Sequence, residues 1–167
     1  MSCQQNILLM RHYALLLIVF ALFFSCQEAA KQKTNADSNV AQEVRKALED
    51  CSNAVQMGGV TAEFKWLDSS ADFFWIPPGF KSPLTFDSVA LIMRRNAGLF
   101  RHIEEKWDLL EIQPLNNEYA VFTGRIISRT TDTANHVQEH QLVETGIMVK
   151  RSDGWKIHCG QTSLLAK

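Results

Sequence analysis

The residues with the clearest chemical spacing are His136, Glu139 and His140, which match the zinc-binding pattern H-x-x-E-H. That pattern works on a helix, because residues four apart share a helical face. Here a turn-forming stretch precedes it and a β-like run follows. On a strand the two histidines would lie about 13 Å apart, at ~3.3 Å per residue. We therefore expect surface histidines, no metal site and no cofactor.

Two mid-strand charges, Arg125 and Glu144, are the other candidates for chemistry. The phasing of the last hairpin, given below, turns Glu144 away from the helices, so we expect a solvated or dimer-facing charge there. The sequence has no Ser/His/Asp order, no glycine-rich phosphate loop and no clustered carboxylates. It leaves open whether the protein is an enzyme.

Cys26 follows an apolar run over residues 13–24, with Arg11 just before the run. The run is too short to cross a ~30 Å hydrocarbon core as a helix, and it fits the apolar part of a signal peptide. Ser25-Cys26 resembles the lipobox of bacterial lipoproteins. We expect a signal peptide over residues 1–25, lipidation of Cys26, and a lipid-anchored domain in the cell envelope that faces the periplasm or the exterior. The alternative is an N-terminal anchor that is never cleaved.

After removal of residues 1–25, 16 basic and 18 acidic side chains remain. This balance lacks the clustered positive charge that nucleic-acid binding requires, so no nucleic-acid partner is expected. Cys51 and Cys159 also remain. An exported compartment permits a disulfide between them, and two buried free thiols are the alternative.

Residues 26–38 are polar and lack aromatic side chains, which predicts a tether before a folded domain over residues 39–167. Apolar residues at helical spacing predict a first helix that Gly58-Gly59 ends, and two shorter helices follow near Thr61 and after Thr85. A short strand is expected over residues 72–76. Four long strands are expected over residues 102–112, 118–129, 137–151 and 155–164. Helices followed by long antiparallel strands predict an α+β domain.

The last hairpin can be phased if Ser152-Asp153-Gly154 is a three-residue loop. Arg151 then pairs with Trp155, and the apolar residues of both strands share one face. The residues predicted to point toward the helices are Val143, Thr145, Ile147, Cys159, Gln161 and Ser163.

The segments over residues 72–79, 118–125 and 146–157 resemble the SnoaL-like branch of the nuclear-transport-factor-2-like superfamily. The resemblance implies a cone, in which a strongly bent antiparallel sheet wraps around three N-terminal helices and leaves a pocket at the open end. It also implies a homodimer formed through the outer face of the sheet. Relatives carry histidines at the positions of Cys159 and Gln161, and isomerase-like relatives use a tyrosine donor, whereas this chain has only Tyr119 after residue 25.

These departures favour binding of a small, largely apolar molecule over acid–base catalysis. The expected pocket residues are Trp75, Met93, Trp107, Phe122, Thr145 and, as the polar anchor, Gln161. An isomerase- or hydrolase-type enzyme and a dimerising interaction module are the alternatives. A buried ionisable pair would favour the enzyme, an apolar closed pocket the binder, and a collapsed cone the interaction module.

Overall fold

The structure is a computed structural model that describes residues 37–165. The predicted signal peptide and Cys26 lie outside the described residues. Asn39 begins a compact unit that contains the elements discussed below, apart from the first two residues of the first helix. Within the described part of the chain, no helix is both long and apolar enough to cross a membrane.

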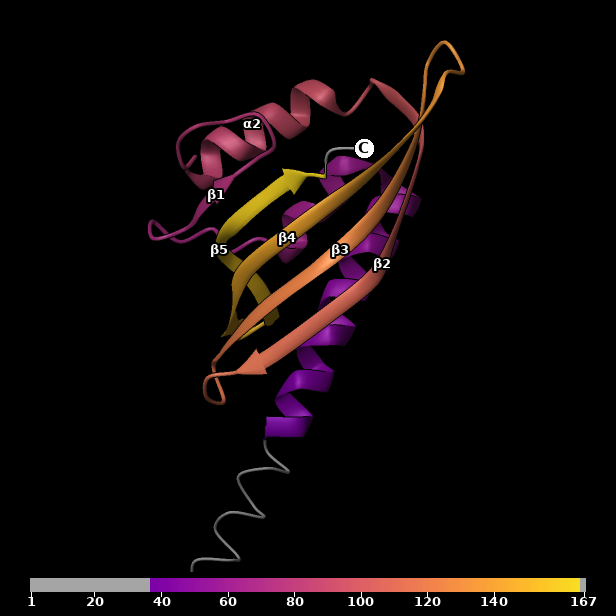
Figure 1. Cartoon of the computed structure of the whole chain (residues 1–167). Helices are drawn as coiled ribbons and strands as arrows, with labels where there is room; N and C mark the ends of the chain where they lie inside the picture. The colour runs from indigo at the N-terminus through magenta and orange to yellow at the C-terminus, as the bar shows by residue number, and fades with distance from the viewer. Residues whose placement is uncertain (1–36, 166–167) are drawn as a thin grey trace, which may run out of the picture. The chain divides into compact units, whose positions relative to one another are not determined.

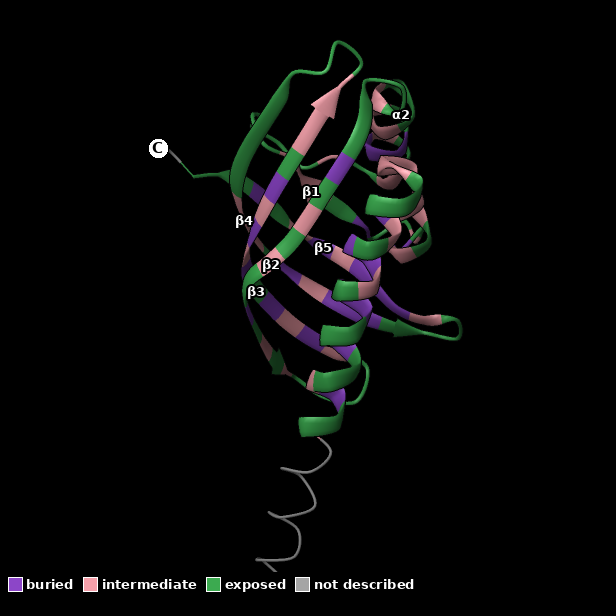
Figure 2. Ribbon diagram, turned by 90° about the vertical axis from the view of Figure 1, so that its right-hand side faces the viewer, coloured by how far each residue is buried: buried purple, intermediate pink, exposed green. Residues whose placement is uncertain are grey.

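Three helical segments precede the long strands (Figure 1). The first is helical over residues 37–58 and ends at Gly59, whose φ of 74° is unfavourable for other residues. The second, expected near Thr61, is the 3-10 helix η1, Val60–Trp66. The third is α2, Phe86–Asn96, which begins after Thr85 as predicted. All three lie on one face of the sheet (Figure 2).

The sheet contains five strands in the order β1-β5-β4-β3-β2. Their bounds are β1 Phe74–Ile76, β2 Phe100–Pro114, β3 Tyr119–Asp132, β4 Val137–Arg151 and β5 Gly154–Leu164. The four long strands are antiparallel, which confirms the α+β fold class. β1 pairs with β5 in parallel, so the sheet is mixed rather than wholly antiparallel. The hairpin connections fix the direction of the long strands, whereas β1 joins β5 from far away in the chain, and its direction is free to be parallel.

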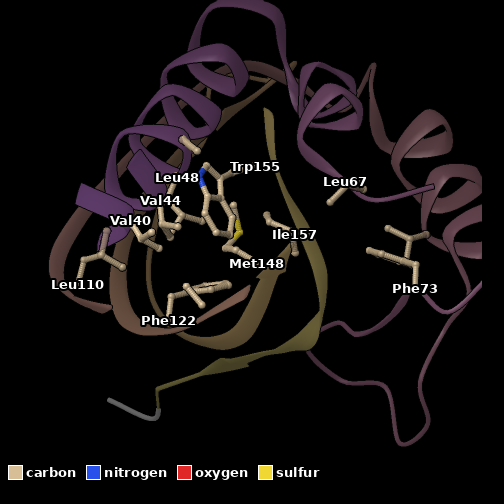
Figure 3. Close-up of a cluster of buried hydrophobic side chains, with 13 residues drawn as sticks. Val40, Val44, Leu48, Leu67, Phe73, Leu110, Phe122, Met148, Trp155 and Ile157 are labelled. Carbon is tan, nitrogen blue, oxygen red and sulfur yellow. The ribbon is translucent and has the colours of Figure 1, made fainter. Parts of the chain in front are cut away.

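The core lies between the first helix and the concave face of the sheet (Figure 3). Val44, Phe122 and Met148 are fully buried there. The Trp155 indole donates a hydrogen bond to Glu43 of the first helix at 2.9 Å, and the Lys150 ammonium donates to the same carboxylate at 2.7 Å. The β4–β5 hairpin is therefore held against the helix by apolar burial and by a shared carboxylate.

Three glycines on the concave face each lie beneath an aromatic ring. A Cβ atom at Gly124 would lie 2.7 Å from the Trp107 ring, and one at Gly160 would lie 2.6 Å from the Trp75 ring. A Cβ atom at Gly146 would lie 2.9 Å from the Phe122 ring. Glycine in a strand often marks such a close approach. We call Gly124, Gly146 and Gly160 the glycine row, because it lets three rings contact the backbone of β3, β4 and β5.

The predicted phase of the last hairpin is wrong. Arg151 pairs with Gly154, so the turn contains two residues, and a bulge in β5 at His158 then restores the expected pairing of Ile147 with Cys159. The partners predicted for residues 143–147 are thus correct, but their faces are exchanged. The side chains on the concave face of β4 are Leu142, Glu144, Gly146, Met148 and Lys150.

The sequence left open whether Cys51 and Cys159 form a disulfide, and the structure has the alternative, two free and buried thiols. Cys51 lies on the first helix, toward the concave face. Cys159 lies beyond the bulge in β5 and pairs with Phe74 of β1 and Ile147 of β4. The bulge turns the Cys159 side chain to the opposite face of β5 from the one assumed, and so away from Cys51.

We predict that Gly146→Ala destabilises the domain by about 1–3 kcal/mol, the typical cost of overpacking a core. Its Cβ atom would lie 2.6 Å from the Cys159 carbonyl oxygen as well as against Phe122. Denaturant unfolding measures the effect. Gly98→Ala is the matched control, because no atom lies within 4 Å of its Cβ position. Equal stability of the two variants would contradict the assignment of the glycine row.

Candidate functional site

A pocket of about 160 Å³ lies between α2, η1 and the concave face of β4 and β5. Its apolar wall comes from α2, from the segment around β1 and from Leu67. The lining residues are Glu63, Leu67, Phe73, Trp75, Pro77, Val89, Ile92, Met93, Glu144 and Thr162. An apolar wall with a few polar groups is the usual composition of a small-molecule site.

A hydrogen-bonded chain positions the Glu144 carboxyl at this pocket. The Trp75 indole N–H donates to Thr162 Oγ1 at 2.9 Å, and the Thr162 hydroxyl donates to Glu144 Oε1 at 2.9 Å. Glu144 of β4 pairs with Thr162 of β5, and Gly146 pairs with Gly160 two residues away along each strand. The contact of Trp75 with Gly160 brings its indole within reach of Thr162, so the glycine row helps to build the site.

The second carboxyl, that of Glu63, enters the pocket from η1. No described residue makes a hydrogen bond or an ion pair with it. Burial, and then the charges of Glu144 and Glu105, raise its pKa to about 8. Burial also raises the pKa of Glu144 to about 7, although the Thr162 hydrogen bond acts in the opposite direction. Both carboxyls therefore titrate close to neutral pH.

A third carboxyl, that of Glu105, lies on the concave side of β2, and burial raises its pKa. Cys51 of the first helix lies close enough to all three carboxyls that their charges add to burial in raising the pKa of its thiol. The thiol stays protonated and unreactive as a nucleophile. Of these ionisable groups, the two carboxyls that line the pocket are therefore the ones able to exchange a proton near neutral pH.

At neutral pH the arrangement holds one protonated carboxyl, Glu63, beside a carboxyl that is partly ionised, Glu144. Two such groups in one pocket supply a general acid and a general base. Their pKa values lie near the pH at which acid–base catalysis is most effective.

The loop that carries Leu67 into the pocket is tied to β5 and to the last turn. The Asp68 amide donates to the Ile157 carbonyl at 2.8 Å. The Asp68 carboxylate accepts hydrogen bonds from Arg151 at 2.6 and 3.1 Å, and from His158 Nδ1 at 2.8 Å. Burial raises the pKa of Asp68, but these bonds, with one from Ser70, hold it well below its usual value. This ion-pair network fixes the segment next to Glu63.

The sequence-predicted pocket residues divide into three groups. Trp75 and Met93 line the pocket. Trp107 and Phe122 pack edge to face in the neighbouring core, with ring centres 6.1 Å apart. Thr145 and Gln161 are exposed on the opposite face of the sheet, so Gln161 is not the polar anchor. The two-residue turn and the bulge at His158 exchange the faces on which that prediction depended.

Glu63 and Thr162 were not among the pocket residues predicted from the sequence, and Glu144 was predicted to face away from the helices. The glycines in the strands carry the information that would have placed two of them. Gly146 and Gly160 mark the crowded concave face. Glu144 lies two residues before Gly146 and Thr162 two residues after Gly160, so each shares the face of its glycine. Glu63, in contrast, lies on a short 3-10 helix with no pattern that marks its direction.

His136 and His140 are not among the residues that line this pocket, and both are exposed near the β3–β4 turn. His136 Nδ1 lies 3.0 Å from Asp132 Oδ2, and His140 Nε2 lies 3.3 Å from Gln138 Oε1. Across residues 37–165, no group of three or more His, Cys, Asp or Glu residues has an arrangement that could hold a metal ion.

No family model matches the chain, and no curated protein matches it in sequence. Solved structures do match its fold. A nuclear transport factor 2-like superfamily protein from Salmonella enterica aligns with a TM-score of 0.65 and 18% identity over 78% of this chain and 94% of that one. A proposed dehydratase of the same family from Streptomyces avermitilis aligns with a TM-score of 0.64 and 17% identity over 78% of this chain and 99% of that one.

A ketosteroid isomerase-like protein from Erwinia carotovora aligns with a TM-score of 0.61 and 14% identity, over 76% of this chain and 97% of that one. Identities this low establish the fold alone. The domain therefore has the nuclear transport factor 2-like fold, which confirms the fold that the resemblance implied.

We predict that Glu63→Gln stabilises the domain increasingly as the pH rises from 5 to 8, by about 1–3 kcal/mol at the upper end. The raised pKa of Glu63 means that the folded state holds its proton more tightly than the unfolded state. In the unaltered protein, the stabilisation that comes from this proton is complete below about pH 4.5 and is lost as the pH approaches 8. Urea unfolding across this range measures it, and the exposed Glu118→Gln is the control. A constant difference across the range would contradict the pKa assignment.

Proposed function

We propose that the pocket binds a small, largely apolar molecule and that Glu63 and Glu144 transfer protons to and from it. The proposal rests on the two carboxyls that lie in a mostly apolar pocket. The pKa of Glu63 is raised to about 8 and that of Glu144 to about 7. This half-buried ionisable pair favours the enzyme among the alternatives. An open pocket is also at odds with a collapsed cone that serves only as an interaction module.

The proposed step uses the two carboxyls in opposite roles. The Glu144 carboxylate removes a proton from a carbon next to a polarised group, and the C–H electron pair forms a new C=C bond. The Glu63 carboxyl gives its proton to the oxygen of that group. A carbonyl becomes an enol, or a hydroxyl leaves as water. In either case Glu144 ends protonated and Glu63 ionised, and proton exchange with solvent restores the pair.

The size of the pocket limits the ligand. A cavity of 150 Å³ accommodates benzene, so about 160 Å³ suits a body of one six-membered ring. The similar structures include a proposed dehydratase and an isomerase-like protein, and both names describe reactions that move protons. Binding without catalysis is the second candidate, which the apolar wall of Phe73, Ile92 and Met93 favours.

Hydrogen exchange at a ring ketone tests the reaction. We expect the protein to accelerate deuterium incorporation at the α-carbon of cyclohexanone in D₂O, followed by proton NMR. Glu144→Gln should lower the catalysed rate at least about 100-fold, because a positioned general base contributes 10²–10⁴-fold. Glu63→Gln should also lower it, through loss of the acid.

Glu118→Gln is the control, since Glu118 is exposed at the β2–β3 turn and should leave the rate unchanged. Protein-observed NMR shifts at pocket residues show whether cyclohexanone binds. Binding without accelerated exchange would contradict the catalytic part of the proposal and leave the binding part in place.

We also propose that the domain is held on a membrane through lipid-modified Cys26, on the basis of the apolar run that ends at Ser25-Cys26. A lipidated cysteine carries acyl chains, each methylene of which adds about 0.8 kcal/mol of membrane affinity. In a bacterial host, Cys26→Ser should prevent both processing and labelling by a fatty-acid probe, and should release the domain from the membrane fraction. Cys51→Ser is the matched control. Labelling that persists in Cys26→Ser would refute the anchor.

A further inference from the structure

The carboxyls of the pocket have no cationic partner among the described residues. Several acidic side chains elsewhere in the domain do pair with basic ones, as Asp68 does with Arg151, Asp108 with Arg125 and Glu43 with Lys150. Of the described residues that line the pocket, only Glu63 and Glu144 have ionisable side chains.

The charges on the elements around the pocket leave this imbalance in place. From β2, Glu105 adds a third acid, and the first helix contributes the neutral thiol of Cys51. On α2, Arg94 is exposed and stacks on the Phe64 ring, with its guanidinium carbon 5.1 Å from the ring centre. From β5, His158 points to Asp68. No basic group between residues 37 and 165 neutralises Glu144, so a negatively charged ligand would meet like charge from these residues.

The shape and chemistry of the wall suit a cation attached to an apolar body. Phe73 and Trp75 present aromatic rings to the pocket, and aromatic faces attract cations. Glu144 is held in place by Thr162, so its second oxygen remains available to a ligand. An ammonium next to this carboxylate would supply the positive charge that the protein itself does not provide.

We propose that the natural ligand is a small amine, bound as its ammonium form against Glu144, with a body of about one ring in the apolar part of the pocket. The inference takes the location of the pocket from the proposed function but does not depend on the reaction. It deepens that function by specifying the charge of the ligand: cations are preferred, neutral molecules of the same shape bind less tightly, and anions are rejected.

Three probes that share a cyclohexane ring test the charge preference by isothermal titration calorimetry at pH 7. They are cyclohexylamine, cyclohexanol and cyclohexanecarboxylate. Alkyl ammonium groups have pKa values of about 10, so the amine is a cation under these conditions. We expect the amine to bind at least tenfold more tightly than the alcohol, and the carboxylate to bind at least tenfold more weakly than the alcohol.

Proton release distinguishes an ammonium at Glu144 from one bound elsewhere. At pH 6 Glu144 is mostly protonated, because its pKa is raised to about 7. An ammonium that pairs with its carboxylate should therefore displace nearly one proton, measured by titration in two buffers of different ionisation enthalpy. Cyclohexanol should displace none.

Glu144→Gln keeps an oxygen to accept the Thr162 hydrogen bond and removes only the charge. In this variant the amine should bind no more tightly than the alcohol, and proton release should disappear. Glu118→Gln should behave as the unaltered protein does. An amine that binds no better than the alcohol, or whose preference survives Glu144→Gln, overturns the inference. If cyclohexanone exchange is nevertheless catalysed, the proposed function stands without it. If none of the ring probes binds, both fail.

Discussion

The close approach of aromatic rings to the glycine row is the constraint on which the rest of the site depends. Because Gly160 has no Cβ atom, Trp75 lies against β5, and its indole N–H reaches Thr162 at 2.9 Å. Because Gly124 has no Cβ atom, the Trp107 ring lies against β3 at this position. Gly124 pairs with Glu144 of the neighbouring strand β4. Two of these rings pack in or beside the core, and the third supplies one wall of the pocket. Packing and chemistry therefore share the same three backbone positions.

The acids of this domain show how the surroundings, rather than burial alone, set the proton affinity of a carboxyl. Asp68 is only 5% exposed, yet hydrogen bonds from Arg151, Ser70 and His158 outweigh its burial and lower its pKa. Glu63 is half-buried and has no basic partner in the described part of the chain, and its pKa rises to about 8. The first arrangement stabilises the loop next to the pocket, and the second leaves a group that can exchange a proton near neutral pH.

The irregular β5 strand links these two regions. Before the bulge at His158, β5 contacts the first helix through Trp155 and the Asp68 loop through Ile157. After the bulge it contributes Gly160 and Thr162 to the concave face. One extra residue thus lets a single strand turn His158 toward the ion-pair network and still present Thr162 to Glu144. Bulges next to functional sites commonly re-aim side chains in this way.

Local patterns in the sequence were sufficient for the helices and strands, because hydrophobic periodicity and turn residues act over a few neighbouring positions. The first helix, the start of α2, the four long strands and the partners of residues 143–147 all follow from them. The faces of the last hairpin did not follow, since Val143, Ile147 and Val149 are as apolar as Met148, and one bulge reverses the phase. The sequence also did not determine that Glu63 and Glu144 line the same pocket. They lie 81 residues apart in the chain, and only the fold brings Glu63 of η1 to the concave face of β4. Charge in the sequence is visible, but the burial that raises a pKa exists only in the tertiary structure.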